Sequence, residues 1–234
     1  VVTGEYGDGR YTDEIFWAAA ELYKVTGKAA YNDYIVKEYS PMVPAGFGWA
    51  DVGYYGMAAY LSIPADKVDS ATYTTFKNAL IQKADTIVSD SKKDGYLISL
   101  EKNYPWGSNM TVANNAMHLL LANKIQPNAE YVEVAREHLH YCFGKNPMSI
   151  SYVTGYGTVS PISTHHRPSA ALAKTMPGML VGGPNKNLED PYAKAVLTDC
   201  PPAKCYVDNI QSFSCNEITI YWNSPLIYVM SNVG

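Results

Sequence analysis

The feature that most constrains this chain is a change of pattern near residue 144. Before that point, apolar side chains recur every three or four residues, which is the spacing of one face of an α-helix. From residue 144 to 216, Gly and Pro interrupt the chain repeatedly and there is no sustained helical stripe. A loop region of this length inside a compact domain usually carries function. The pattern predicts an all-α fold with long functional loops gathered at one end.

Six helices are expected before the loop region, and one further element after it. Capping residues, Gly and Pro mark the ends of these segments. The last segment is rich in Val, Ile and Tyr, so helix and strand both stay open there, and Pro225 would kink a helix. The expected helices cover 12–27, 30–39 (ended by Ser40 and Pro41), 51–62, 70–89, 109–123 and 128–143, and the open segment is 217–230.

Composition limits the kinds of partner. The chain has 234 residues, of which 47% are apolar and 17% charged, so it can bury a substantial core and does not resemble a disordered tail. A net charge of −4 without a basic run argues against a nucleic-acid partner, and no run of 18 apolar residues is present to span a membrane. The chain has 20 Tyr but only 5 Phe, which suits surfaces where the aromatic ring packs while the hydroxyl meets water or a polar partner. Such surfaces are either the walls of a sugar-binding cleft or packed helices with solvent-exposed edges, and composition alone favours the helices.

The cysteines and the first residues leave questions open. Cys200 and Cys205 bracket Pro-Pro-Ala-Lys, a turn short enough for a disulfide, although sequence cannot supply the geometry. Four cysteines do not fix the redox compartment. The chain opens at Val1 with neither Met nor a signal peptide, so we expect a processed product or a part of a larger fold.

His165, His166 and Arg167 stand in three successive positions of the loop region. The ordinary interpretation is a solvated surface turn, which three such residues in an arbitrary loop favour. The functional interpretation is a polar cluster that hydrogen-bonds hydroxyls or orients a carboxylate. Metal binding is the weaker alternative, because adjacent histidines in an extended loop tend to point in opposite directions.

Two carboxylates, Asp208 and Glu217, lie nine residues apart around Phe213. Capping of a helix N-terminus explains both in the ordinary case. The functional interpretation is a carboxylate pair for acid–base hydrolysis of an acetal. That chemistry needs an acid that is still protonated near neutral pH, and the apolar residues after Glu217 can raise its pKa. Spacing alone does not decide between the two.

Trp106 and Asp13 are further candidates. Trp106 lies in a turn before a helix, where its indole is either an anchor on the core or a platform for a sugar ring. Asp13 and Glu14 begin the first expected helix. Helix capping suffices to explain Asp13, and the more specific but weaker alternative is that it is a calcium ligand.

Two longer motifs contain several of these candidates, and the C-terminal one is Tyr206-x-Asp208-x4-Phe213-x3-Glu217-x-Thr219-x3-Asn223-Ser224. At every defined position this run resembles the second active-site signature of family 9 glycoside hydrolases, the inverting cellulases. The run Ser151-x-Val153-Thr154-x2-Gly157, ending in His165-x-Arg167, resembles the first, with departures at Val159 and Thr164 that concern fine substrate positioning. Shorter similar strings are Asp13-Glu14 with Trp17-Ala18-Ala19, Trp106-Gly107-Ser108-Asn109 and Gly144-Lys145-Asn146-Pro147.

The resemblance implies an (α/α)6 toroid with a substrate cleft across the end where the loops gather. It implies that Glu217 is the general acid, that Asp208 supports the site, and that His165 lies near the scissile bond. It assigns substrate binding to Arg167, His166, Trp106 and Trp222, and a structural calcium to Asp13. No cofactor is required for the chemistry.

One element of the family pattern lies outside this chain. Family members carry the water-activating base in an Asp-Ala-Gly-Asp motif, and the nearest string here is Asp51-Val52-Gly53-Tyr54. A full toroid also needs more than 234 residues. The resemblance therefore implies that residues 1–234 are the C-terminal half of one catalytic domain, which pairs with an N-terminal half that holds the base.

The function implied is hydrolysis of β-1,4-glucosidic bonds in cellulose and related β-glucans, with inversion and an endo mode of attack. An exo-acting cellobiohydrolase and a non-catalytic glucan-binding fragment are the alternatives. Secretion is expected, because insoluble glucan cannot enter a cell.

Overall fold

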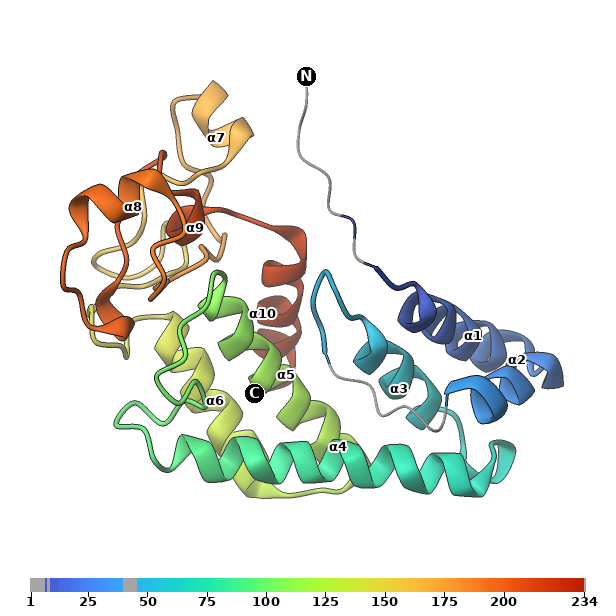
Figure 1. The fold of residues 1–234 in the computed structure, drawn as a ribbon. Coiled ribbons are helices and arrows are strands. Elements are labelled where there is room, and N and C mark those ends of the chain that lie inside the picture. Colours follow the sequence, from blue (N-terminus) through green and yellow to red (C-terminus); the bar gives the residue numbers. More distant parts are fainter. Residues whose placement is uncertain (1–6, 8, 40–45, 234) are drawn as a thin grey trace. The chain divides into compact units, whose positions relative to one another are not determined.

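The computed structural model describes residues 7, 9–39 and 46–233, and it divides the chain into two compact units, 1–83 and 84–234 (Figure 1). The described residues form helices and loops, with two isolated β-bridges and no strand. The all-α class predicted from the helical spacing is therefore confirmed. None of the helices in the described segments combines the length and hydropathy needed to cross a bilayer.

The first unit packs helix α1 against helix α3. It contains α1 (Thr12–Thr26), α2 (Ala29–Tyr34), a π-helical turn (Ile35–Tyr39), α3 (Gly53–Leu61), a 3-10 turn (Ala65–Lys67) and the first part of α4 (Ser70–Ser91). Phe16 stacks on Tyr39 with ring centroids 3.8 Å apart and meets Phe76 edge-on at 5.5 Å. Gly56 allows the close approach of α3, because a Cβ there would lie 2.5 Å from the Phe16 ring.

The C-terminal ends of two expected helices can be compared with the structure of this unit. Helix α1 ends as predicted at Gly27, whose left-handed backbone lets its N–H bond to the carbonyl of Tyr23. The helix expected over 30–39 is α-helical only to Tyr34, and the π-helical turn that follows buries Ile35 and Tyr39. The stop expected at Ser40 and Pro41 lies outside the described residues.

The second unit is built on α5, which packs against both α6 and α10. It contains the end of α4, α5 (Ser108–Ile125), α6 (Ala129–Cys142) and α10 (Ile220–Asn232). The segment left open by the sequence is therefore a helix, and Pro225 lies inside α10 without ending it. Apolar side chains from the helices and from the loops between them share one core, which includes Ile98, Val112, Tyr141, Tyr152, Leu180 and Leu226.

The region between α6 and α10 is mostly loop, as predicted. It holds only short helices: α7 (Arg167–Ala171), α8 (Pro191–Val196), a 3-10 turn (Pro202–Lys204) and α9 (Phe213–Asn216). In Figure 1 these elements gather at the end of the second unit where α5 and α10 begin. Cys200 and Cys205 form a disulfide around the 3-10 turn, and Cys142 and Cys215 are free and buried.

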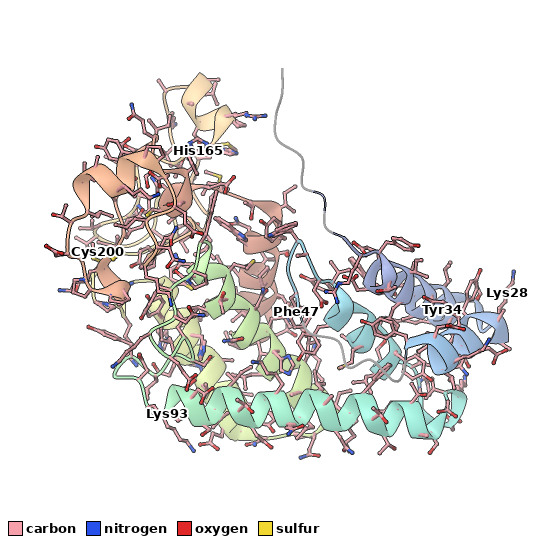
Figure 2. All side chains as sticks on the ribbon, in the orientation of Figure 1. Lys28, Tyr34, Phe47, Lys93, His165 and Cys200 are labelled. Atoms are coloured by element: carbon pink, nitrogen blue, oxygen red, sulfur yellow. A yellow bond between two sulfur atoms is a disulfide. The ribbon has the colours of Figure 1, made fainter. Side chains whose placement is uncertain are left out.

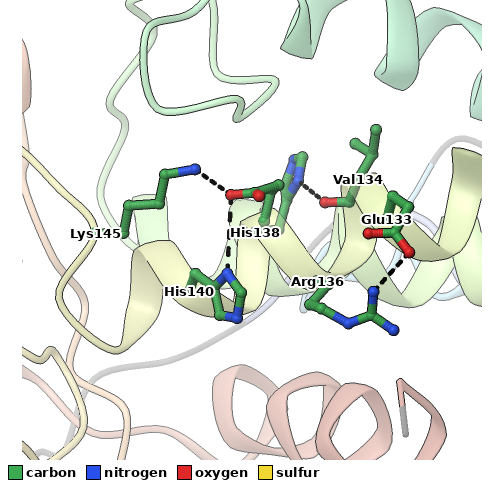
Figure 3. A network of polar contacts seen from close by, with 7 residues as sticks. Glu133, Val134, Arg136, His138, His140 and Lys145 are labelled. Carbon is green, nitrogen blue, oxygen red and sulfur yellow. Dashed lines mark hydrogen bonds and ion pairs between the residues drawn. The ribbon is translucent and has the colours of Figure 1, made fainter.

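Helix α6 carries a buried histidine on one side and ion pairs on the other (Figure 3). Nδ1 of His138 donates to the carbonyl of Val134 at 2.8 Å, and Nε2 accepts the backbone N–H of Ser99 at 3.2 Å. Burial disfavours the imidazolium and lowers the pKa of His138 to about 4, although Glu137 opposes the shift. The fold therefore requires a neutral imidazole at this position.

We expect His138 to make the protein less stable in mild acid. Because the imidazole takes up a proton near pH 6.5 when unfolded and near pH 4 when folded, the free energy of unfolding falls as the pH drops through this interval. At about 1.4 kcal/mol for each pKa unit, the loss reaches about 3 kcal/mol. Denaturant titrations from pH 7 to pH 4 measure it. His140→Gln, on the exposed side of α6, should keep this pH dependence, whereas His138→Asn should remove it; an unchanged slope in His138→Asn contradicts the assignment.

Candidate active site

The best candidate site surrounds Glu217, which lies between α9 and α10. Neighbouring loops hold its backbone on both sides. Gly182 donates its N–H to the carbonyl of Glu217 at 3.1 Å, and His165 donates its N–H to the carbonyl of Asn216 at 2.8 Å. His165 and Glu217 form an isolated parallel bridge. The two residues come from motifs about fifty positions apart, and the fold brings them side by side.

The Glu217 side chain is half-buried, and this environment favours its protonated form. Burial raises the pKa of the carboxyl above its ordinary value of 4.5, although a hydrogen bond from Trp106 and the charge of His165 lower it. Burial is the largest of these effects. The carboxyl thus keeps its proton to a higher pH than an exposed glutamate would.

An aromatic cluster lies next to this carboxyl. Phe213 stands with its ring centroid 5.4 Å from that of Trp106 and 5.9 Å from that of His165. Trp106 is 38% exposed, so part of the indole is available at the surface, while its N–H donates a hydrogen bond to Glu217. Trp106 therefore reaches solvent and the candidate acid at the same time.

The three residues His165, His166 and Arg167 are directed differently. Nδ1 of His165 donates to the carbonyl of Ile210 at 2.6 Å, which fixes that ring beside Phe213. Nδ1 of His166 is hydrogen-bonded to the hydroxyl of Ser169 at 2.9 Å. Arg167 is exposed at the start of α7. Figure 2 shows His165 among the loop side chains near α7.

Asp208 holds a loop. Its carboxylate accepts the N–H groups of Ile162 and Ser163 at 2.8 and 3.0 Å, and the side-chain amide of Asn216 at 2.7 Å. These three donors connect the loop before His165 to the residue before Glu217. The geometry therefore gives Asp208 a part in aligning the two motifs.

Trp222 lies beneath the site, whereas the sequence placed it on the substrate-binding surface. Its side chain is only 3% exposed. The backbones of Gly107 and Gly182 lie against its ring so closely that a Cβ at either glycine would come within 3.0 Å of it. The first turn of α10 directs the indole into the core, so its faces are covered by protein rather than offered to a sugar.

Asp13 lies in the first unit and acts as a buried backbone acceptor. It is 4% exposed, and its Oδ2 accepts the N–H of Val52 at 2.8 Å. A calcium ion takes six to eight oxygen ligands. Within the described part of the chain there is no group of three or more His, Cys, Asp or Glu side chains that could hold a metal. A calcium ion at Asp13 stays a prediction; among the described residues, Oδ1 of Asp13 has no hydrogen-bond partner.

Two buried polar residues near Glu217 were not singled out from the sequence. Asn216 is fully buried; its Oδ1 accepts the hydroxyl of Tyr206 at 2.7 Å, and its Nδ2 donates to the carbonyl of Ser163 at 2.7 Å. Asp190 is 1% exposed and accepts hydrogen bonds from Ser212 and Ser214, at the other side of α9. The only sequence signal for Asn216 was its position before the candidate acid.

Comparisons with known proteins agree on one family. The profile described as Glycosyl hydrolase family 9 matches residues 1–230. A cellodextrinase of Butyrivibrio fibrisolvens is 34% identical over 99% of this chain and 45% of its own length. Endoglucanase D of Acetivibrio thermocellus is 36% identical over 98% of this chain and 35% of its own length.

A solved structure matches as well. The crystal structure of a single mutant of a thermostable endoglucanase from Alicyclobacillus acidocaldarius has a TM-score of 0.91 and 36% identity, covering 99% of this chain and 44% of that chain. This likeness confirms the predicted (α/α)6 architecture, of which the chain forms a part. The chain spans less than half the length of each of these three proteins.

We expect Gly183→Ala to destabilise the loop that holds Glu217. Gly183 has φ +88°, and a Cβ there would lie 2.4 Å from the Asn109 side chain. Left-handed strain and overpacking together should cost about 2–4 kcal/mol of unfolding free energy, measured by denaturant titration. Gly95→Ala is the control, because nothing lies within 4 Å of its Cβ position. Equal stability of the two variants would contradict the close approach at Gly183.

Proposed function

Because this chain belongs to glycosyl hydrolase family 9, we propose that it is the part of a β-1,4-glucan hydrolase that supplies the general acid. The acid is Glu217. The observation that carries this proposal is a half-buried carboxyl with a raised pKa beside the partly exposed Trp106. A binding surface alone has no need of a carboxyl with a raised pKa at this position.

The proposed chemistry follows from the leaving group. A glycosidic oxygen leaves poorly as an alkoxide, so an acid must protonate it as the bond to the anomeric carbon breaks. Glu217 donates that proton, and burial raises the pKa of its carboxyl, so the proton stays bound to a higher pH than in an exposed glutamate. In an inverting hydrolase a second carboxylate activates water on the opposite face of the sugar, about 6.5–9.5 Å from the acid. We assign that base to the rest of the protein, because the chain carries no Asp-Ala-Gly-Asp motif.

The surface around Glu217 supplies the substrate contacts in this proposal. Trp106 offers an indole face to the C–H face of a glucose ring. His165, fixed by the carbonyl of Ile210, lies beside the acid, and His166 and Arg167 at the start of α7 offer donors to sugar hydroxyls. Asp208 acts by aligning the loop before His165 with Asn216, rather than by touching substrate.

We propose β-1,4-glucans such as cellulose as substrates and an endo mode of attack. The endoglucanase names of two of the matched proteins support this. Product profiles distinguish endo from exo action: an early loss of viscosity of soluble cellulose accompanies endo attack, whereas near-exclusive release of cellobiose from the start accompanies exo attack.

We further propose that the protein acts outside the cell. The disulfide between Cys200 and Cys205 supports this, because such bonds persist in oxidising compartments. An insoluble glucan is also accessible only to a secreted enzyme.

Glu217→Gln in the full-length protein should abolish cellulose hydrolysis. The amide keeps the shape of the side chain but cannot deliver a proton, and general acid assistance contributes about 10²–10⁴-fold. Dinitrophenyl cellobioside has an acidic phenol as leaving group and needs little protonation, so it should lose much less activity. Steady-state rates on both substrates measure the contrast.

Two results would contradict this role for Glu217. Equal losses on the two substrates would show that the carboxyl does not protonate the leaving group. No hydrolysis by the unaltered full-length protein, with glucan binding retained, would favour the non-catalytic alternative. Glucan binding by Glu217→Gln is the control for its fold.

Trp106→Phe should shift the pH dependence of hydrolysis towards alkali. The indole N–H stabilises the carboxylate of Glu217, so its loss raises the pKa of the acid further. Because a general acid works only while protonated, the alkaline limb of the kcat/KM profile should move to higher pH. Loss of sugar stacking alone would lower the rate at every pH and leave the limb in place, which would contradict the proposed hydrogen bond.

A further inference from the structure

Asp190 is a buried carboxylate that the proposed chemistry does not use. It is 1% exposed, and four hydrogen bonds reach its two oxygens. Oδ1 accepts the N–H of Ala193 at 2.7 Å. Oδ2 accepts the hydroxyl of Ser212 at 2.8 Å, the N–H of Ser214 at 3.2 Å and the hydroxyl of Ser214 at 2.5 Å. The two oxygens thus serve two different segments.

Capping of α8 explains only one of these oxygens. Asp190 is the N-cap of α8, and the bond from Ala193 to Oδ1 is the ordinary capping interaction. All three donors on Oδ2 come from the segment that leads to Glu217. Burial alone would raise the pKa of Asp190, but the hydrogen bonds from Ala193, Ser214 and Ser212 outweigh it and lower the pKa, so the group is a carboxylate that accepts only.

The segment that Asp190 holds cannot fix its own position. Helix α9 has four residues, Phe213–Asn216, and a single helical turn is unstable by itself. Ser212 and Ser214 face Asp190, whereas Phe213, between them, faces Trp106 and His165. Asp190 therefore holds the first half of α9 on one side, and on the other side Phe213 faces the candidate site.

We infer that Asp190 is a positioning residue for the general acid, and this rests on the proposed function. It anchors Ser212 and Ser214, and thereby fixes the turn whose next residues are Asn216 and Glu217. Asn216 holds the other end of the turn through Tyr206 and Asp208. Without the Asp190 anchor, Glu217 loses its alignment with the leaving oxygen while glucan still binds.

Asp190→Asn in the full-length protein tests the inference with little change of shape. An amide has one acceptor oxygen, so its NH2 group must face either the N–H of Ala193 or the donors of Ser212 and Ser214. A misplacement of about 1 Å can cost about 10²-fold in rate. We expect kcat on cello-oligosaccharides to fall by about that factor with KM little changed, and kcat on dinitrophenyl cellobioside to fall only a few-fold.

A milder variant and a matched control accompany it. Ser214→Ala removes one of the three bonds to Oδ2 and should show the same contrast at smaller size, even if Asp190→Asn does not fold. Asn146→Asp is the control. Asn146 is 2% exposed, and its amide donates to the carbonyls of Tyr141 and Ile150. Like Asp190→Asn, the change to Asp keeps the shape of the side chain, and it places an acceptor oxygen against acceptor carbonyls. Its losses should be equal on the two substrates.

Glu217→Gln, measured in parallel, separates the two levels of the proposal. A contrast between substrates in Glu217→Gln, but none in Asp190→Asn or Ser214→Ala, overturns the positioning role and leaves the proposed function standing. No contrast in Glu217→Gln overturns the proposed function itself. A contrast in Asn146→Asp as large as that in Asp190→Asn also overturns the positioning role, because any loop disturbance would then produce it.

Discussion

The site depends on one short turn, α9, that buried polar side chains hold from both ends. Asp190 accepts three hydrogen bonds from Ser212 and Ser214, and Asn216 joins Tyr206, Ser163 and Asp208. Unpaired buried polar groups are costly, so each of these partners can take only the arrangement that satisfies the others. The backbone that carries Glu217 therefore has little freedom, and the loops at 162–165 and 182–183 are fixed with it.

Rigidity of this kind lets burial act on the acid. A flexible glutamate would move into solvent and keep its ordinary pKa. Held between α9 and α10, Glu217 stays half-buried, and desolvation outweighs the opposing effects of Trp106 and His165. The helices contribute indirectly: α5 and α10 pack together, and their beginnings carry the glycine and indole contacts on which the loops rest.

The sequence predicted the long helices well, because periodic apolar side chains record the face that each helix buries. It left α10 open, since its Val, Ile and Tyr content suits a strand equally and packing against α5 decides the matter. Helices α8 and α9 are too short to show the helical spacing of apolar residues in the sequence. Glu217, Trp106 and His165 could be chosen from motifs, and the fold brings them together. Asp190 could not be chosen from the sequence, because Asp190-Pro191 is also an ordinary helix start. Its partners Ser212 and Ser214 lie over twenty residues away in the chain. Trp222 was placed on the surface because sequence does not reveal the glycines that cover it.

The central claim is that the fold holds Glu217 as a half-buried acid that keeps its proton to a higher pH than an exposed glutamate does. An NMR titration of the full-length protein with 13C-labelled glutamate side chains tests it most directly, with Glu217→Gln identifying the resonance. The account predicts that the Glu217 carboxyl titrates above 4.5, the ordinary value for glutamate, and above the exposed glutamates of the same sample. A Glu217 pKa at or below that of the exposed glutamates would contradict it.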